Sequence, residues 1–164
     1  YISFPRKTYT NEEYGFSFRY FPLMTLIESN LSGFPANSPP VIKLSKRYSK
    51  EGISGSDITI QIGGIPPNVS GTINSPEELQ QYERGLCGNF AGLFKDMCDP
   101  LLTTPLFTDE GVFGGVRMFD TRNKERVISV SFIQNGHSYT IIGGNLAKKR
   151  EILQIAKTFR FTSP

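Results

Sequence analysis

The chain contains few of the residues on which catalysis and metal binding most often depend. Its 164 residues include one histidine, two cysteines and no tryptophan. A tetrahedral metal site needs four suitable ligands, and two thiols with one distant imidazole do not form a recognisable set. A nucleophile that depends on a histidine base has only His137 available. The sequence therefore predicts no metal site and no cofactor, and an enzyme is the weakest functional hypothesis.

Long apolar runs and a strong excess of one charge are also missing. No stretch approaches the roughly 20 apolar residues that cross a bilayer as a helix. The 18 basic and 15 acidic residues leave a net charge of +3, which is too small to indicate a nucleic-acid partner. Hydrophobic residues make up 38% and charged residues 20% of the chain, as in ordinary globular proteins. The length fits a single domain over residues 1–164.

The start of the chain bears on its location. It begins at Tyr1 and not at a methionine, and its first residues lack the apolar core of a signal peptide. This start fits a protein from which an export signal or a lipid anchor has been removed. We therefore expect a periplasmic or extracellular protein, with membrane association through an anchor outside this sequence as an alternative.

Alternation of apolar and polar residues predicts an antiparallel sheet. The opening strand covers residues 15–21 and places Phe16, Phe18 and Tyr20 on one face. Further strands are predicted at residues 41–48, 57–62, 104–108, 112–120, 126–133 and 137–142. Asn135-Gly136 is typical of a type I′ hairpin turn, because both residues tolerate a positive φ. Residues 27–40 are rich in proline, serine and asparagine, which predicts a surface loop.

Two amphipathic helices accompany these strands. Ser75 and Glu78 form a capping box, with Pro76 at the first helical position. The apolar stripe that follows consists of Leu79, Tyr82, Leu86, Phe90, Leu93 and Met97. A closing helix that runs into Phe161 carries a second stripe of Ile152, Ile155, Ala156 and Phe159. Together these elements predict an α+β fold in which an antiparallel sheet of about six to seven strands is flanked by two main helices, an α/β/α-type sandwich.

The two cysteines, Cys87 and Cys98, leave two interpretations open. On one uninterrupted helix their Cα atoms would lie about 16 Å apart, well beyond the separation of about 4.4–6.8 Å that a disulfide tolerates. A bridge therefore requires the helix to end between them. Pro100 disfavours helical geometry at Asp99 and gives a reason for such an end. A disulfide and a pair of free thiols both stay open.

Several surface features suggest binding. Basic residues cluster at Lys148, Lys149 and Arg150, and a second group consists of Lys43, Lys46, Arg47 and Lys50. A solvated face is the default interpretation of both groups, with contact to an acidic partner or a lipid headgroup as the alternative. The glycine- and proline-rich segment 63–74 offers a possible anchor for a protein contact in Ile65, Pro66, Pro67, Asn68 and Val69. One wetted face of the sheet is a further surface for a partner.

Three segments carry a resemblance to a known family. They are residues 14–22 (YGFSFRYFP), 75–79 (SPEEL) and 155–161 (IAKTFRF). Their order resembles that of the PsbP-like superfamily, which includes the photosystem II extrinsic protein, a Ran-binding nuclear import factor and bacterial lipoproteins or secretion adaptors. The resemblance implies an antiparallel sheet flanked by helices and a non-enzymatic role in binding or assembly, often outside the cytoplasm. It transfers no catalytic residues to this chain.

The leading hypothesis is therefore a binding or assembly domain that engages a protein partner. One alternative is a carrier of a small apolar ligand, held between the sheet and the helix that bears Leu86, Phe90 and Phe94. The other alternative is a small enzyme that uses His137 or Cys87.

Overall fold

Two antiparallel sheets form the framework of the protein. A computed structural model describes residues 5–29, 38–45, 58–64, 71–79, 81–82, 103–120, 126–143 and 149–162. The larger sheet has seven strands, in the order β3 (Thr25–Ser29), β4 (Val41–Ser45), β5 (Ile58–Gly64), β9 (His137–Gly143), β8 (Arg126–Gln134), β7 (Phe113–Asp120) and β6 (Thr103–Phe107). The smaller sheet has three, in the order β1 (Lys7–Asn11), β2 (Phe16–Tyr20) and β10 (Arg160–Phe161).

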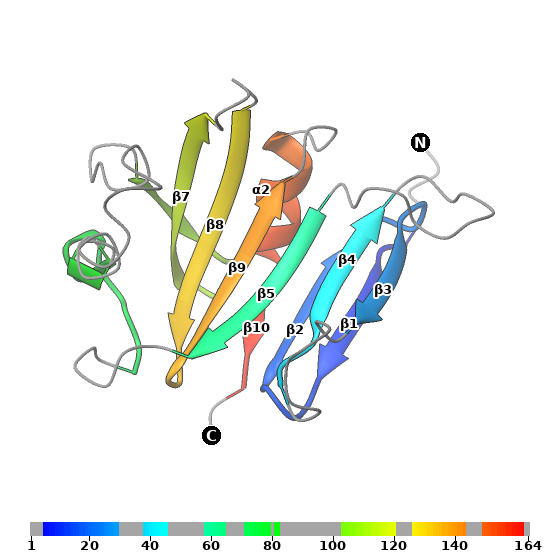
Figure 1. Cartoon of the computed structure of the whole chain (residues 1–164), viewed down its shortest axis with the longest axis horizontal. Helices are drawn as coiled ribbons and strands as arrows, with labels where there is room; N and C mark the ends of the chain where they lie inside the picture. The colour runs from blue at the N-terminus through cyan, green and yellow to red at the C-terminus, as the bar shows by residue number, and fades with distance from the viewer. Residues whose placement is uncertain are drawn as a thin grey trace.

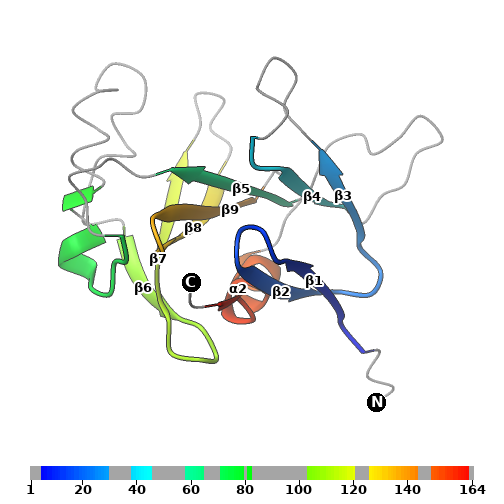
Figure 2. The same cartoon turned by 90° about the horizontal axis from the view of Figure 1, so that it is seen from below.

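The smaller sheet and helix α2 (Lys149–Lys157) lie side by side against one face of the larger sheet. Figure 2 shows this arrangement from below, with β4, β5 and β9 in one layer and α2, β1 and β2 in the other. In Figure 1 the same second layer lies behind the larger sheet, and the viewer looks onto the opposite face. Among the described residues, no helix is long and apolar enough to cross a membrane.

Aromatic rings fill the core between the two layers. Phe16 and Phe18 of β2, Phe132 of β8 and Phe159 after α2 are each at most 1% exposed. Phe18 and Phe159 stack with ring centroids 5.0 Å apart, and Phe132 lies 5.4 Å from Phe159. Because buried aromatic side chains contribute large apolar areas, this stack joins the smaller sheet, the end of α2 and the larger sheet.

The predicted strands are confirmed wherever they fall on described residues, and the closing helix is confirmed as far as Lys157. Each predicted strand is observed with both its bounds within two residues of the prediction, except that the end of the strand predicted at 41–48 lies outside the described residues. Asn135 and Gly136 have φ values of 53° and 80°, as a type I′ turn requires. In α2, the predicted stripe of Ile152, Ile155 and Ala156 is completely buried.

The predicted helix start at Ser75 is also confirmed. The Glu78 N–H donates a hydrogen bond to Ser75 Oγ at 3.3 Å, and the Glu78 carboxylate accepts one from the Asn74 N–H at 3.4 Å. Residues 76–79 and 81–82 are helical. Leu79 is buried with Ile73, Phe113 and Ile133, on the face of the larger sheet opposite α2.

The remainder of this helix lies outside the described residues, and so do Cys87 and Cys98. The sandwich with a helix on each face, the disulfide and the single-domain organisation therefore stay predictions.

Three strands correct the sequence prediction. Residues 27–29 belong to edge strand β3 and not to a surface loop. The apolar–polar alternation that predicts strands does not identify β3, because the neighbouring residues Ile27 and Glu28 are both exposed. β1 is also an edge strand and contains one apolar residue, Tyr9. Helix α2 ends at Lys157 and does not reach Phe161, which instead pairs with Phe16 in the two-residue strand β10.

Candidate functional site

The central strands of the larger sheet present a polar face. Its polar side chains alternate along the strands with the buried core residues and are half-buried or exposed, and they share this face with half-buried Ile142 and buried Ile133. Figure 1 looks onto this face, and no described helix or strand lies in front of β5, β8 and β9. The polar face consists of Thr59, Gln61, Ser131, Ser138 and Thr140. The wetted sheet face predicted from the sequence is therefore present in the described part of the chain.

Strand register places these side chains in a row. Gln61 lies opposite Thr140, and Thr140 lies opposite Ser131 on the next strand. Hydroxyl groups both donate and accept hydrogen bonds. Serine and threonine also lose less rotamer freedom on binding than long side chains do. A row of this kind on central strands is suited to hydrogen bonding with another polar surface.

The predicted binding loop begins and ends beside the polar face. Gly64, the last residue of β5, pairs with His137. The Gly71 carbonyl accepts a hydrogen bond from the Gly136 N–H at 2.7 Å. Both ends of the segment therefore lie at the β8–β9 turn. The predicted anchor residues themselves lie outside the described residues: Ile65, Pro66, Pro67, Asn68 and Val69. Their role stays a prediction.

His137 lies at this turn among aromatic rings. Its ring centroid is 5.8 Å from that of Tyr14, edge to face, and 6.3 Å from that of Tyr139. His137 Nδ1 lies 3.2 Å from the Asn135 carbonyl oxygen. These contacts position the imidazole but bring no nucleophile to it from the described residues, and Cys87 lies outside them. No group of three or more histidine, cysteine or acidic side chains in the described ranges is placed to hold a metal ion.

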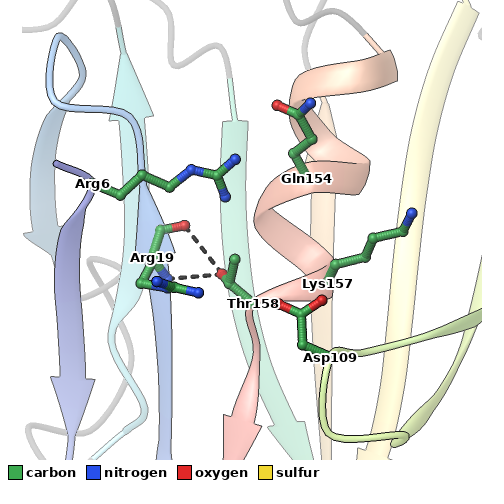
Figure 3. A pocket seen from close by; sticks show the side chains of 6 residues that line it. All are labelled: Arg6, Arg19, Asp109, Gln154, Lys157 and Thr158. Carbon is green, nitrogen blue, oxygen red and sulfur yellow. Dashed lines mark hydrogen bonds between the residues drawn. The ribbon is translucent and has the colours of Figure 1, made fainter. Parts of the chain in front are cut away.

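A second polar feature is a groove of about 450 Å³ between the smaller sheet and the end of α2. Figure 3 shows that its residues come from three directions. Arg6 and Arg19 come from the strand side, Gln154 and Lys157 from α2, and Asp109 from the turn after β6. We call this the cationic groove, lined by Arg6, Arg19, Asp109, Gln154, Lys157 and Thr158.

Hydrogen bonds of Thr158 join the elements of the cationic groove. Its buried hydroxyl accepts a hydrogen bond from the Arg19 N–H at 2.8 Å and donates to the Ile155 carbonyl at 2.7 Å. The Arg19 carbonyl, at 3.2 Å, is a second acceptor within reach. The Lys157 carbonyl accepts a hydrogen bond from the Asp109 N–H at 2.8 Å. Segments distant in sequence are therefore fixed beside one another at this site.

The structure separates the predicted basic patch from the cationic groove. Lys149 and Arg150 are exposed in the first turn of α2, at the end opposite Lys157. Lys148 lies outside the described residues. The sequence does not reveal the groove, because Arg6, Arg19 and Lys157 are far apart from one another in the chain. The available signals were the exposed position of Arg19 on an alternating strand and the position of Lys157 in the last turn of a helix.

Tyr9 forms a polar link between the two sheets. Its hydroxyl donates a hydrogen bond to Glu28 Oε1 of β3 at 2.9 Å and accepts one from Asn11 Nδ2 at 3.2 Å. Burial is the main cause that raises the pKa of Tyr9 to about 12, with the Glu28 carboxylate acting in the same direction and the hydrogen bond from Asn11 acting against it. The neutral phenol is therefore the form that suits this position.

Comparisons with known proteins identify the fold and nothing finer. No family model and no curated protein matches the sequence. The structure is similar to the solution structure of cyanobacterial PsbP (CyanoP) from Synechocystis sp. PCC 6803, with a TM-score of 0.55 and 13% identity, covering 96% of this chain and 92% of that one. A crystal structure from Bacteroides thetaiotaomicron matches with a TM-score of 0.45 and 9% identity, covering 96% of this chain and 48% of that one. The chain has a PsbP-like fold, as its three segments predict.

Proposed function

We propose that the protein is a non-catalytic binding or assembly domain that docks onto a protein partner through its polar face and the adjoining segment 63–74. The open polar face of the central strands is the observation that carries this proposal. The PsbP-like resemblance supports it, because that superfamily's role is binding or assembly. By the same resemblance we propose a location outside the cytoplasm, in the periplasm or the extracellular space.

The size of the polar face explains why the adjoining segment belongs to the proposal. The three strands of the polar face, about 4.8 Å apart, and five residues of about 3.4 Å each define roughly 240 Å². A stable protein interface buries about 800 Å² on each partner. The partner must therefore reach beyond the strands. Segment 63–74 is the nearest candidate, because Gly64 and Gly71 hold its two ends at the β8–β9 turn.

The chemistry of the polar face indicates the kind of partner surface. Its five polar side chains carry four hydroxyls and one amide, without a formal charge. Lys43 of β4 pairs with Thr59 and is exposed at the margin of the polar face. A wet interface with many hydrogen bonds is the type that such a surface forms. The predicted anchors of residues 65–69 would add the apolar part of the contact.

The test is to crosslink the protein to its partner in the envelope fraction and the soluble fraction of its native cells, and to identify what is captured. Thr140→Arg places a long charged side chain in the centre of the polar face. Thr10→Arg makes the same change at an exposed position of β1, on the smaller sheet, and serves as the matched control. We expect the native sequence and Thr10→Arg to capture the same protein, and Thr140→Arg to lose it, with melting temperatures unchanged in both variants.

Two results would count against the proposal. Undiminished capture by Thr140→Arg would remove the polar face from the interaction. Capture of nothing by the folded native protein would favour the carrier alternative, whose proposed ligand lies beside Leu86, Phe90 and Phe94, outside the described residues.

A further inference from the structure

The basic side chains of the cationic groove are not neutralised by the described structure. Arg6, Arg19 and Lys157 make no ion pair among the described residues, and the nearby ion pair joins Arg160 to Glu110 at 3.3 Å. The guanidinium carbon of Arg6 lies 5.0 Å from the centroid of the Phe21 ring. Stacking of this kind holds a guanidinium in place while leaving its charge intact.

The end of helix α2 does not cancel this charge. The last carbonyls of a helix carry the negative end of its dipole and repel anions when they are unpaired. Here the Ile155 carbonyl accepts a hydrogen bond from the Thr158 hydroxyl at 2.7 Å, and the Lys157 carbonyl accepts one from the Asp109 N–H at 2.8 Å. Donors therefore occupy these carbonyls beside the basic side chains.

We propose that the cationic groove binds the phosphate group of a small phosphorylated molecule, with Arg6 and Arg19 as its principal contacts. Guanidinium groups match the geometry of phosphate oxygens and stay charged at physiological pH. Figure 3 shows Arg6 extending from the strand side toward α2, with Gln154 on the facing helix. The Gln154 amide supplies a further donor.

The remaining groove residues indicate how the ligand is oriented. In Figure 3, Lys157 extends from α2 on the side away from Arg6 and Arg19, and Asp109 lies below Lys157. The carboxylate of Asp109 disfavours negative charge at that end, so the phosphate belongs at the arginine end. A groove of about 450 Å³ falls within the range of about 300–1,000 Å³ typical of small-molecule sites. It leaves room for the polar body of a phosphate monoester.

This inference goes beyond the proposed function, because the cationic groove lies in the second layer and the polar face lies on the opposite side of the larger sheet. The probe is glycerol phosphate, titrated into the ¹⁵N-labelled full chain at low ionic strength, where screening of exposed charges is weak. Sodium chloride at matched ionic strength is the reference. We expect saturable shifts of the backbone amides of Arg19, Lys157 and Thr158 with glycerol phosphate alone.

Arg19→Gln tests the principal contact. The two backbone hydrogen bonds between Arg19 and Thr158 do not involve the Arg19 side chain, so we expect this variant to keep the native melting temperature. Loss of one charge-assisted hydrogen bond weakens binding by about tenfold or more. Arg150→Gln makes the same change in the first turn of α2 and is expected to bind within about twofold of the native protein, since a distant exposed charge contributes little.

Three results would overturn the proposal. The first is the same response to chloride as to glycerol phosphate, and the second is shifts centred away from the groove. The third is an equal loss of affinity in Arg19→Gln and Arg150→Gln, which would show a general effect of charge. None of these results affects partner capture by the polar face, so the two proposals fail separately.

Discussion

Replacement of Thr158 by valine removes one hydroxyl while nearly preserving the shape of the side chain. Thr158 is 5% exposed. The register of β2 with β10 pairs Arg160 with Ser17, so Thr158 stands opposite Arg19. At this position the chain is still leaving α2, and the Thr158 hydroxyl accepts the Arg19 N–H in place of a backbone carbonyl. The variant therefore removes the first hydrogen bond of the pairing between β2 and β10.

The magnitude follows from the two hydrogen bonds that are lost. The Arg19 N–H loses its acceptor in a partly buried position, which costs about 1–3 kcal/mol. The Ile155 carbonyl keeps the Thr158 N–H as a donor at 3.0 Å. Loss of its second donor, the Thr158 hydroxyl, therefore costs about 1 kcal/mol. We expect a decrease of about 2–4 kcal/mol in the free energy of unfolding. For a chain of this length, the melting temperature then falls by roughly 10 °C.

Equilibrium unfolding in urea, followed by circular dichroism on the full chain, measures this change. Thr158→Ser keeps the hydroxyl and is the control, expected within about 1 kcal/mol of the native protein. The reasoning is refuted if Thr158→Val unfolds within about 0.5 kcal/mol of Thr158→Ser with an unchanged m-value. That result would mean that the hydroxyl does not hold β2 to the end of α2.

Two further predictions concern other contacts. A Cβ atom at Gly115 would overlap the buried side chain of Leu79, so Gly115→Ala is expected to lower the free energy of unfolding by about 1–3 kcal/mol. Gly64→Ala, with open space around its Cβ, is the control in urea unfolding, and equal stability of the two variants would contradict the packing argument. Because the pKa of Tyr9 is raised from 10.0 to about 12, the stability that its neutral phenol contributes is complete below pH 10 and is lost as the pH rises through 12. Tyr9→Phe should therefore lose less stability than the native protein between pH 10 and 12, and parallel pH profiles would be evidence against this linkage.

The predictability of each strand depended on its position in the fold. β5 and β8 lie inside the larger sheet, where alternate side chains are buried in the core between the two layers, and their apolar period is visible in the sequence. β3 lies at an edge, where Ile27 is 38% exposed. An edge strand with little burial carries a weak hydrophobic pattern. β10 has only two residues, too few for a pattern.

The polar face and the cationic groove also differed in how far the sequence predicted them. The polar face was predictable because one strand's alternation determines both its buried and its exposed side chains. The cationic groove was not, because Arg6, Arg19 and Lys157 acquire a common position only when β1, β2 and the end of α2 come together. Local sequence carries no information on that juxtaposition.

The order of amino acids alone was enough to locate the central strands, the helix cap at Ser75, the Asn135-Gly136 turn and the buried stripe of α2, because each depends on residues close together in the chain. Folding added the division into two sheets and the assembly of the cationic groove. Both depend on long-range contacts, such as the hydrogen bond between Arg19 and Thr158 across 139 residues. Such a contact exists only because the aromatic core holds β2 and α2 against the same face of the larger sheet.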